Sequence, residues 1–467
     1  MSVHSRKKRR MESGHFDLVV VGCGGGHDET NLSGYLLKPR DKQWSDGILG
    51  LEAGSGYGAL KQLFGTTHPH LFASLFKPNA SKRPYSATDK AHIVFTHLRA
   101  YLISHAHLDH CASLIISSGS LPGPTRHILG TQSVLEDLER CIWRPGRCWP
   151  RIVGWDHDSS SNTAGGILRA LKLAPGTDTI GDRDEEYAPI GAGFDDLLVR
   201  VVPVSHGCSY TSSAFFIRHA RTRHEFLFFG DVEADPVPDS SSPASSPSSS
   251  PCPSARPLLL PIWQHAAHLF TCNRLRALLI ECSYPAGRAE SQMFGHLSVE
   301  GLRKEIKVLA AEVAKLRPKV AEEVTKPRVV EIEDLPTNAT KVRSSLRRPL
   351  KRKPSSDLPH PRTRSLTKSP SATLSLTKPA TPGPLTGLRV IVTHCKEPPP
   401  GFDLQGAPSI ADYIVRQLKY GVGALGPDET GVEYIAAHQG DEFGELSSFC
   451  SARSVQVSRV PWDGGVI

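Results

Sequence analysis

Apolar and polar positions alternate along the chain in blocks that are typical of a large α/β protein. Short β-branched and aromatic runs predict strands at 16–22, 35–37, from Ile48, and at 100–103, 197–204, 214–217, 225–229, 276–280, 388–393 and 431–438. Apolar residues at helical spacing predict helices at 112–118, 132–143, 299–316 and 410–420. Residues 57–98 are expected to be mostly helix or loop, and residues 144–196 are expected to cross the surface.

The length of 467 residues and the 39% hydrophobic content are enough for a large buried core. Three segments lack the apolar residues that a core requires: the tail 1–15, the Ser/Pro-rich stretch 235–257 and the basic Ser/Pro-rich stretch 317–386. We therefore predict a disordered tail, followed by a single domain over 16–467 that is interrupted by two disordered insertions.

The net charge of +8 is concentrated in two of these segments. Arg6–Arg10 is wholly basic, and residues 341–378 contain eleven Lys and Arg against one acidic residue, so the remainder of the chain is acidic. An acidic body disfavours a nucleic-acid substrate, because such binding depends on Lys and Arg contacts to phosphate.

The sequence also limits the compartment of the protein. It shows no secretory signal and no apolar run long enough to span a bilayer. None of the ten cysteines forms a Cys-x-x-Cys pair, which disfavours a structural zinc site. We expect a cytoplasmic protein without membrane contact. Arg6–Arg10 is compatible with a nuclear localisation signal, although a solvated basic tail is the favoured interpretation.

The strongest chemical signal is the stretch that follows the strand 100–103. His105, His107, Asp109 and His110 occur within six residues. Residues two apart in an extended chain share a face, so His105 and His107 can reach one cation while Asp109 and His110 are aimed at a second. Imidazole and carboxylate suit zinc, iron or manganese. A His-rich surface loop is the alternative, but its position at a strand end before a helical pattern favours two metal ions.

Three later residues stand at the ends of predicted strands and fit the same centre. His206 follows the strand 197–204 and can supply a third imidazole to the first ion. Asp231 follows 225–229, and one carboxylate can offer an oxygen to each of two ions. His394 follows 388–393 and fits the second ion.

These motifs resemble the metallo-β-lactamase superfamily, and the form His-Ala-His-Leu-Asp-His-Cys-Ala-Ser-Leu resembles its class II cyclic-nucleotide phosphodiesterases of the fungal low-affinity type. The later Ser-His-Gly, Gly-Asp, Glu-Cys-Ser-Tyr-Pro, Gly-His-Leu and Thr-His segments occur in the matching order. Cys111 departs from the usual aliphatic residue. The resemblance implies an αββα sandwich of two mixed sheets flanked by helices.

The resemblance further implies a site and a reaction. One ion would be held by His105, His107 and His206, the other by Asp109, His110 and His394, with Asp231 between them. Asp109 is also expected to act in catalysis. Glu281 and His296 resemble an acid–histidine couple that protonates the leaving oxygen. Asn31 and Ser33 resemble residues at the edge of the active site and are expected to contact substrate. The strand end at Glu52 is expected to be structural only.

The expected activity is metal-dependent hydrolysis of cyclic AMP, with cyclic GMP left open, to the nucleoside 5′-monophosphate. Zinc is the expected ion and manganese the alternative. The segment Arg352-Lys-Pro-Ser355 resembles a target of cAMP-dependent kinase, and the superfamily allows a homodimer. Three other functions stay open: a tRNA 3′-processing endonuclease, a thioester hydrolase, and an inactive scaffold that acts through its basic segments.

Overall fold

The computed structural model describes residues 15–76, 83–120, 123–144, 146, 148–149, 153–154, 168–174, 184–207, 210–236, 259–325 and 383–444. Arg6–Arg10, Ser355 and most of the two predicted insertions lie outside these residues. The predicted disorder and the single-domain division therefore stay predictions. Both sheets described below belong to one compact unit that includes residues up to Lys319 and from Gly383 onward.

The described strands form two mixed sheets. The first has eight strands in the order β15-β1-β2-β3-β4-β5-β7-β6, and the second has seven in the order β14-β13-β12-β11-β10-β9-β8. Their bounds in chain order are β1 Phe16–Gly22, β2 Gly34–Pro39, β3 Ile48–Leu51, β4 Leu98–Leu102, β5 Arg126–Gly130, β6 Val153–Gly154, β7 Leu168–Lys172, β8 Ala188–Gly191, β9 Phe194–Ser205, β10 Thr211–His219, β11 Glu225–Phe229, β12 Leu275–Glu281, β13 Arg389–Thr393, β14 Glu433–Ala436 and β15 Glu442–Phe443.

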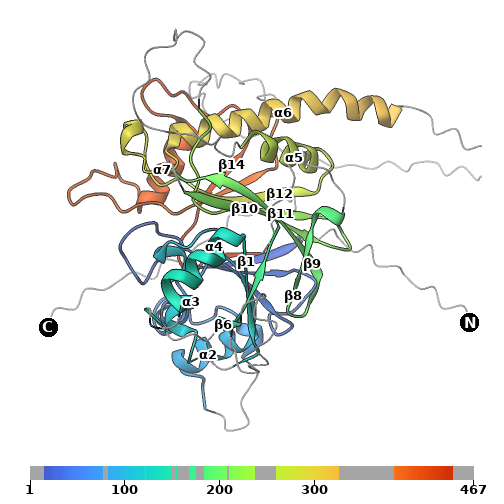
Figure 1. Cartoon of the computed structure of the whole chain (residues 1–467). Coiled ribbons are helices and arrows are strands. Elements are labelled where there is room, and N and C mark those ends of the chain that lie inside the picture. Colours follow the sequence, from blue (N-terminus) through green and yellow to red (C-terminus); the bar gives the residue numbers. More distant parts are fainter. Residues whose placement is uncertain are drawn as a thin grey trace, which may run out of the picture. The chain divides into compact units, whose positions relative to one another are not determined.

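The helices cover the outer faces of the sheets (Figure 1). They are α1 Tyr57–Gly65, α2 Ala87–His97, α3 Leu108–Ser117, α4 Gln132–Asp137, α5 Leu260–Thr271, α6 Val299–Thr325 and α7 Ile410–Tyr420. One apolar cluster joins α1 to α4 with the first sheet, and a second joins α5, α6 and α7 with the second sheet. A third cluster fills the space between the two sheets. The layers are therefore helix, sheet, sheet, helix, and the predicted αββα sandwich is confirmed.

Alternation along the strands explains this layering, because successive side chains of a strand point to opposite faces. In β1, Leu18 and Val20 pack between the sheets, whereas Val19 and Val21 pack under the helices of the first sheet. Both faces of the strand are covered, so its sequence is apolar almost throughout rather than alternating.

Several predicted boundaries were wrong. The helix predicted to begin at Ala112 begins at Leu108, so Asp109 lies in its first turn, where the helix dipole favours an acidic side chain. The helix predicted at 132–143 is α-helical only to Asp137 and continues as a π-helix over Leu138–Trp143. The helix predicted at 299–316 extends to Thr325, into the stretch predicted as an insertion.

The prediction that 144–196 only crosses the surface was also wrong. Strands β6 and β7 complete one edge of the first sheet, and β8 forms the edge of the second. In β7 only Leu168 and Ala170 are buried, and such a short alternating segment gives a weak sequence signal. Among the described helices, none combines the length and apolar character needed to cross a bilayer.

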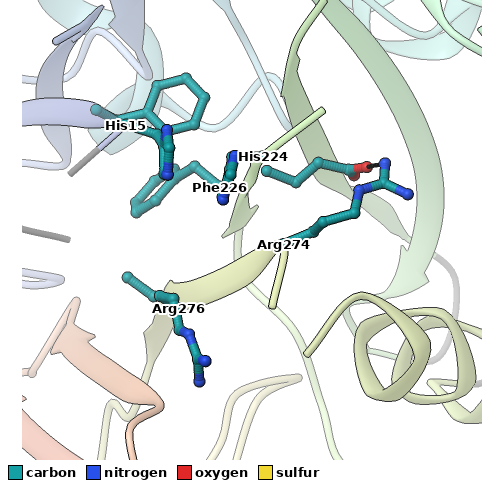
Figure 2. A pocket seen from close by; sticks show the side chains of 8 residues that line it. His15, His224, Phe226, Arg274 and Arg276 are labelled. Atoms are coloured by element: carbon teal, nitrogen blue, oxygen red, sulfur yellow. Dashed lines mark hydrogen bonds and ion pairs between the residues drawn. The ribbon is translucent and has the colours of Figure 1, made fainter. Parts of the chain in front are cut away.

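A small hollow lies at the edge where β1, β11 and β12 begin (Figure 2). The rings of His15 and His224 stack there with centroids 3.2 Å apart, and Arg274 pairs with the buried carboxylate of Glu225. The residues identified above as candidate ligands follow the opposite, carboxyl ends of β4, β9, β11 and β13. The chemistry is therefore concentrated at one edge of the sandwich.

Candidate metal centre

Strand direction brings the candidate ligands together. In the second sheet β11, β12 and β13 run parallel. Strand β9 runs in the same direction, because both β9 and β11 are antiparallel to β10. His206, Asp231 and His394 follow these strands, and all reach the same rim. His105 and His107 follow β4 of the first sheet, and His107 caps the N-terminus of α3.

The rim holds two groups of ligand atoms that share one carboxylate. The first group is His105, His107, His206 and Asp231, and the second is Asp109, His110, Asp231 and His394; within each group the ligand atoms lie within 4.8 Å of one another. The Asp231 carboxylate is 3.3 Å from His110 Nε2 and 3.2 Å from His394 Nε2. The structure thus brings together all seven residues predicted as ligands.

Several donor atoms in these groups fit a cation. His105 Nε2, His110 Nε2 and His394 Nε2 are buried without a hydrogen-bond partner in the described part of the chain. Buried polar atoms are normally paired. Burial opposes ionisation of Asp231, yet the facing imidazoles of His110 and His394 hold the pKa of this carboxyl well below its usual range. Nitrogen and carboxylate donors around a shared anion suit two divalent ions.

Three of the candidate ligand histidines contact a polar group through Nδ1, the ring nitrogen opposite Nε2, and this contact orients the ring. His105 Nδ1 is 2.8 Å from Ser104 Oγ, and His206 Nδ1 is 2.8 Å from the carbonyl oxygen of Gly295. His394 Nδ1 is 2.9 Å from Ser33 Oγ. Such partners fix which nitrogen faces a metal.

His107 is held differently. It is exposed, and among the described residues no hydrogen bond to its ring is found apart from a 3.4 Å contact between its Nδ1 and His206 Nε2, which belongs to the same group of ligands. Its ring instead stacks on Tyr210. The Tyr210 hydroxyl donates to Asp137 and accepts from the backbone N–H of Ala106. A tyrosine whose hydroxyl is held by two hydrogen bonds therefore supports this ring.

Glu52 is a functional candidate that the sequence reasoning missed. Its carboxylate is 1% exposed, lies 3.7 Å from His110 Nδ1, and accepts the backbone N–H of Ser104 at 3.2 Å. Burial raises the pKa of Glu52, and the contact with His110 opposes that shift. The residue was expected to be structural only, although its place in a Glu-x-Gly turn, where the superfamily often has Asp-x-Gly, was a usable signal.

Ser33 and Asn31, which are expected to contact substrate, both make hydrogen bonds within the protein. Ser33 is 2% exposed and its hydroxyl is directed at His394. The Asn31 side chain accepts the backbone N–H of Cys23 at 2.9 Å. The Ser33 hydroxyl thus helps to orient His394, and the expected contact of Asn31 and Ser33 with substrate stays a prediction.

Glu281 and His296 form a pair beside the two groups. His296 Nδ1 lies 3.0 Å from Glu281 Oε1 and 3.7 Å from Asp231 Oδ2. Glu281 is anchored by the Val232 N–H at 2.7 Å and the Ser283 hydroxyl at 2.6 Å. Burial of His296 favours its neutral form, but the Glu281 carboxylate outweighs this and raises the pKa of the imidazole. The pair can hold a proton next to the shared carboxylate.

Comparison with known proteins agrees with this arrangement. The family model described as class-II cAMP phosphodiesterases matches residues 19–326, more than half of the chain. The matched range ends before His394, whose assignment to the second group therefore depends on its position after β13 and on its distance from the other ligand atoms.

Relatives and a solved structure extend the comparison. A probable 3′,5′-cyclic-nucleotide phosphodiesterase of Yersinia pestis is 28% identical over 294 residues, covering 63% of this chain and 72% of the relative. A 3′,5′-cyclic-nucleotide phosphodiesterase of Schizosaccharomyces pombe is 27% identical over 310 residues, covering 64% and 76%. The crystal structure of unliganded yeast PDE1 superposes with a TM-score of 0.61 at 18% identity, over 92% of this chain and 99% of that one. The structural match supports the fold, and the family match identifies the chain as a member of the class-II cAMP phosphodiesterases.

Proposed function

We propose that this chain hydrolyses 3′,5′-cyclic AMP, and cyclic GMP, to the nucleoside 5′-monophosphate with two divalent ions, zinc in the first instance and manganese as the alternative. The observation that carries the proposal is the pair of ligand groups sharing Asp231, with the Glu281–His296 pair 3.7 Å from that carboxylate. In a cell this activity would lower cAMP signalling.

His105, His107 and His206 would hold one ion, Asp109, His110 and His394 the other, and Asp231 would contact both. When bound, two such ions acidify water and neutralise charge on a phosphoryl group during in-line displacement. The exposed His107 leaves this part of the site open to solvent, as a catalytic centre requires.

His296 is the proposed proton donor to the 3′ oxygen of the substrate. Its Nδ1 is occupied by Glu281, so Nε2 is the nitrogen that can deliver a proton. The raised pKa of His296 favours the protonated form near neutral pH. A positioned acid of this kind contributes about 10²- to 10⁴-fold to a rate. Asp109 would assist through its place in the second ligand group.

The test is hydrolysis of cAMP and cGMP by purified protein, with and without a chelator, and with product identified by chromatography. We expect chelator-sensitive release of 5′-AMP, loss of activity in Asp231→Ala, and a fall of about 10²- to 10⁴-fold in His296→Gln. Formation of 3′-AMP would contradict the assigned leaving oxygen. Absence of turnover by metal-replete protein would reject the proposal and direct the assay to precursor tRNA and thioesters.

Metal content of the same preparations, measured by elemental analysis, tests the cofactor proposal separately. Two equivalents of transition metal are expected in the wild-type chain. A chain that neither contains nor takes up metal would support the scaffold alternative.

A further inference from the structure

A wall of aromatic and guanidinium groups extends outward from His296. The Tyr284 ring meets the imidazole of His296 edge-on at 6.1 Å between centroids. The guanidinium of Arg288 lies over the Tyr284 ring at 3.9 Å, and it is 6.0 Å from the ring centroid of Phe294. Four planar groups are thus linked by contacts, beginning at the proposed proton donor.

The outer members of this wall are open to solvent. Phe294 is 69% exposed, and Arg288 is exposed as well, whereas Tyr284 is buried beneath the guanidinium. A large apolar ring left in water is costly by about 25 cal/mol per Å² of apolar surface. The exposed faces of Phe294 and Arg288 are therefore accessible to a planar ligand.

The backbone holds Phe294 in this position at a conformational cost. Phe294 has φ 51°, a left-handed conformation that is unusual for a bulky residue, and Gly295 follows with φ 80°. This turn also brings the Gly295 carbonyl to His206 Nδ1 at 2.8 Å. Strained residues cluster at functional sites. One turn thus presents an aromatic ring and orients a candidate metal ligand.

We propose that Phe294 and Arg288 form the platform on which the purine base of the substrate stacks. The inference rests on the proposed function. With the cyclic phosphate at the ligand groups and its 3′ oxygen at His296, the base is attached to the same ribose only a few bonds away. Aromatic rings and arginine planes are the surfaces on which proteins stack unpaired bases.

The platform predicts a substrate class. Stacking tolerates different bases because every base has a π face. A base that stacks on the Phe294 ring and on the guanidinium plane of Arg288 is contacted through its face, and this contact does not read the donors and acceptors of its edge. The site is therefore suited to cyclic purine nucleotides in general, and cAMP and cGMP are expected to have KM values within about tenfold of each other.

The test compares two variants of Phe294, one that removes the aromatic ring and one that keeps an aromatic ring. Phe294→Asn removes the ring but suits a left-handed backbone, whereas Phe294→Trp keeps a stacking surface. Arg288→Met removes the guanidinium plane, and Tyr420→Ala removes an aromatic residue of similar exposure (70%) at the end of α7 as a control. Substrates are cAMP, cGMP and a base-free 1-deoxyribose 3′,5′-cyclic phosphate.

Loss of stacking is expected to raise KM for cAMP and cGMP by about tenfold in Phe294→Asn and in Arg288→Met, with little change in kcat. KM for the base-free substrate is expected to stay at the wild-type value in Phe294→Asn and Arg288→Met. Phe294→Trp is expected to raise KM for cAMP and cGMP less than Phe294→Asn does, and Tyr420→Ala is expected to match wild type with all substrates. Unchanged cAMP KM in both Phe294→Asn and Arg288→Met overturns the platform, as does an equal rise for the base-free substrate. Failure of the wild-type protein to hydrolyse cAMP is a different result, which rejects the proposed function itself.

Discussion

The phenol ring of Tyr210 lies parallel to the imidazole of His107, with ring centroids 4.7 Å apart and planes within 6°. Tyr210 thereby replaces the hydrogen-bond partner that Ser104, Gly295 and Ser33 supply to other ligand histidines. The orientation of the exposed imidazole depends on this stack and on the Asp137 contact that anchors the phenol.

Replacement of Tyr210 by Ala is expected to weaken metal binding at the His105, His107 and His206 group by about 10- to 100-fold, as loss of an outer partner does at other metal sites. Chelator competition measures the affinity. Tyr210→Phe keeps the ring and should retain most of the affinity. If Tyr210→Ala lowers the free energy of unfolding of the metal-free protein but leaves the metal affinity unchanged, Tyr210 contributes only to packing.

Gly25 and Gly26 are adjacent, yet they should respond very differently to substitution. A Cβ on Gly25 would lie 2.5 Å from His394 Cδ2 and 2.6 Å from its Nε2, whereas the nearest atom to a Cβ on Gly26 would be the backbone nitrogen of Glu397 at 3.7 Å. Gly25→Ala is therefore expected to displace His394 and to remove most metal-dependent activity. Gly26→Ala should behave as wild type. Similar metal content in the two variants would contradict this view of the turn.

Glu52→Gln removes the charge that faces His110 while preserving shape. We expect the affinity of the Asp109, His110 and His394 group for metal to fall by about 10- to 100-fold. A matched control is Glu305→Gln, another buried carboxylate, which accepts from Trp263 Nε1 at 2.8 Å away from the ligand groups. This control should change the free energy of unfolding and leave metal affinity unaltered. An equal loss of metal affinity in Glu52→Gln and Glu305→Gln would contradict the role of Glu52 in supporting His110.

Protonated His438 is expected to stabilise the fold, and this stabilisation should be lost at alkaline pH. Its Nδ1 lies 3.5 Å from Asp441 Oδ2 and its Nε2 lies 3.0 Å from Asp412 Oδ2. The Asp441 contact, with help from Asp412, raises the pKa of His438 from 6.5 to about 9. A raised folded-state pKa gives stability that is fully present below pH 6.5 and lost as pH rises through about 9.

The measurement for His438 is the urea midpoint of wild type and His438→Gln from pH 6 to pH 10. The side chain is 45% exposed, so the difference in unfolding free energy is expected to be below about 1 kcal/mol. The two proteins should converge at the alkaline end. A constant difference across the range would indicate that protonation of His438 does not contribute.

The ligand histidines could be found from sequence because they follow apolar runs that predict strands. The carboxyl ends of parallel strands lie at the same edge of a sheet, so residues that follow such strands come close together. The fold class followed from the same strands together with the resemblance of the motifs. The partners of these histidines could not be found in this way. Glu52 approaches His110, and Tyr210 approaches His107, only through the packing of distant segments.

The missed elements have local causes. Strand β6 has two residues and carries no periodic pattern. Strand β5 begins with Arg126 and His127 and has only two large apolar residues, Ile128 and Leu129, which is too short a run to predict a strand. Helix α5 is buried over much of its circumference, including Trp263, His265 and Ala266, and therefore lacks a clear polar face. The start of α3 was placed too late because Asp109 and His110 read as turn residues, although an acidic first turn is favourable for a helix.

The order of the ligands along the chain also sets the order in which they become available during synthesis. The backbone N–H of His394 donates to the Cys23 carbonyl at 2.7 Å, so the last ligand docks against the first strand. A ribosome releases the N-terminal part first, and His105, His107, His206 and Asp231 all emerge long before β13. A nascent chain therefore contains every residue of the first ligand group, including the shared Asp231, before His394 completes the second group.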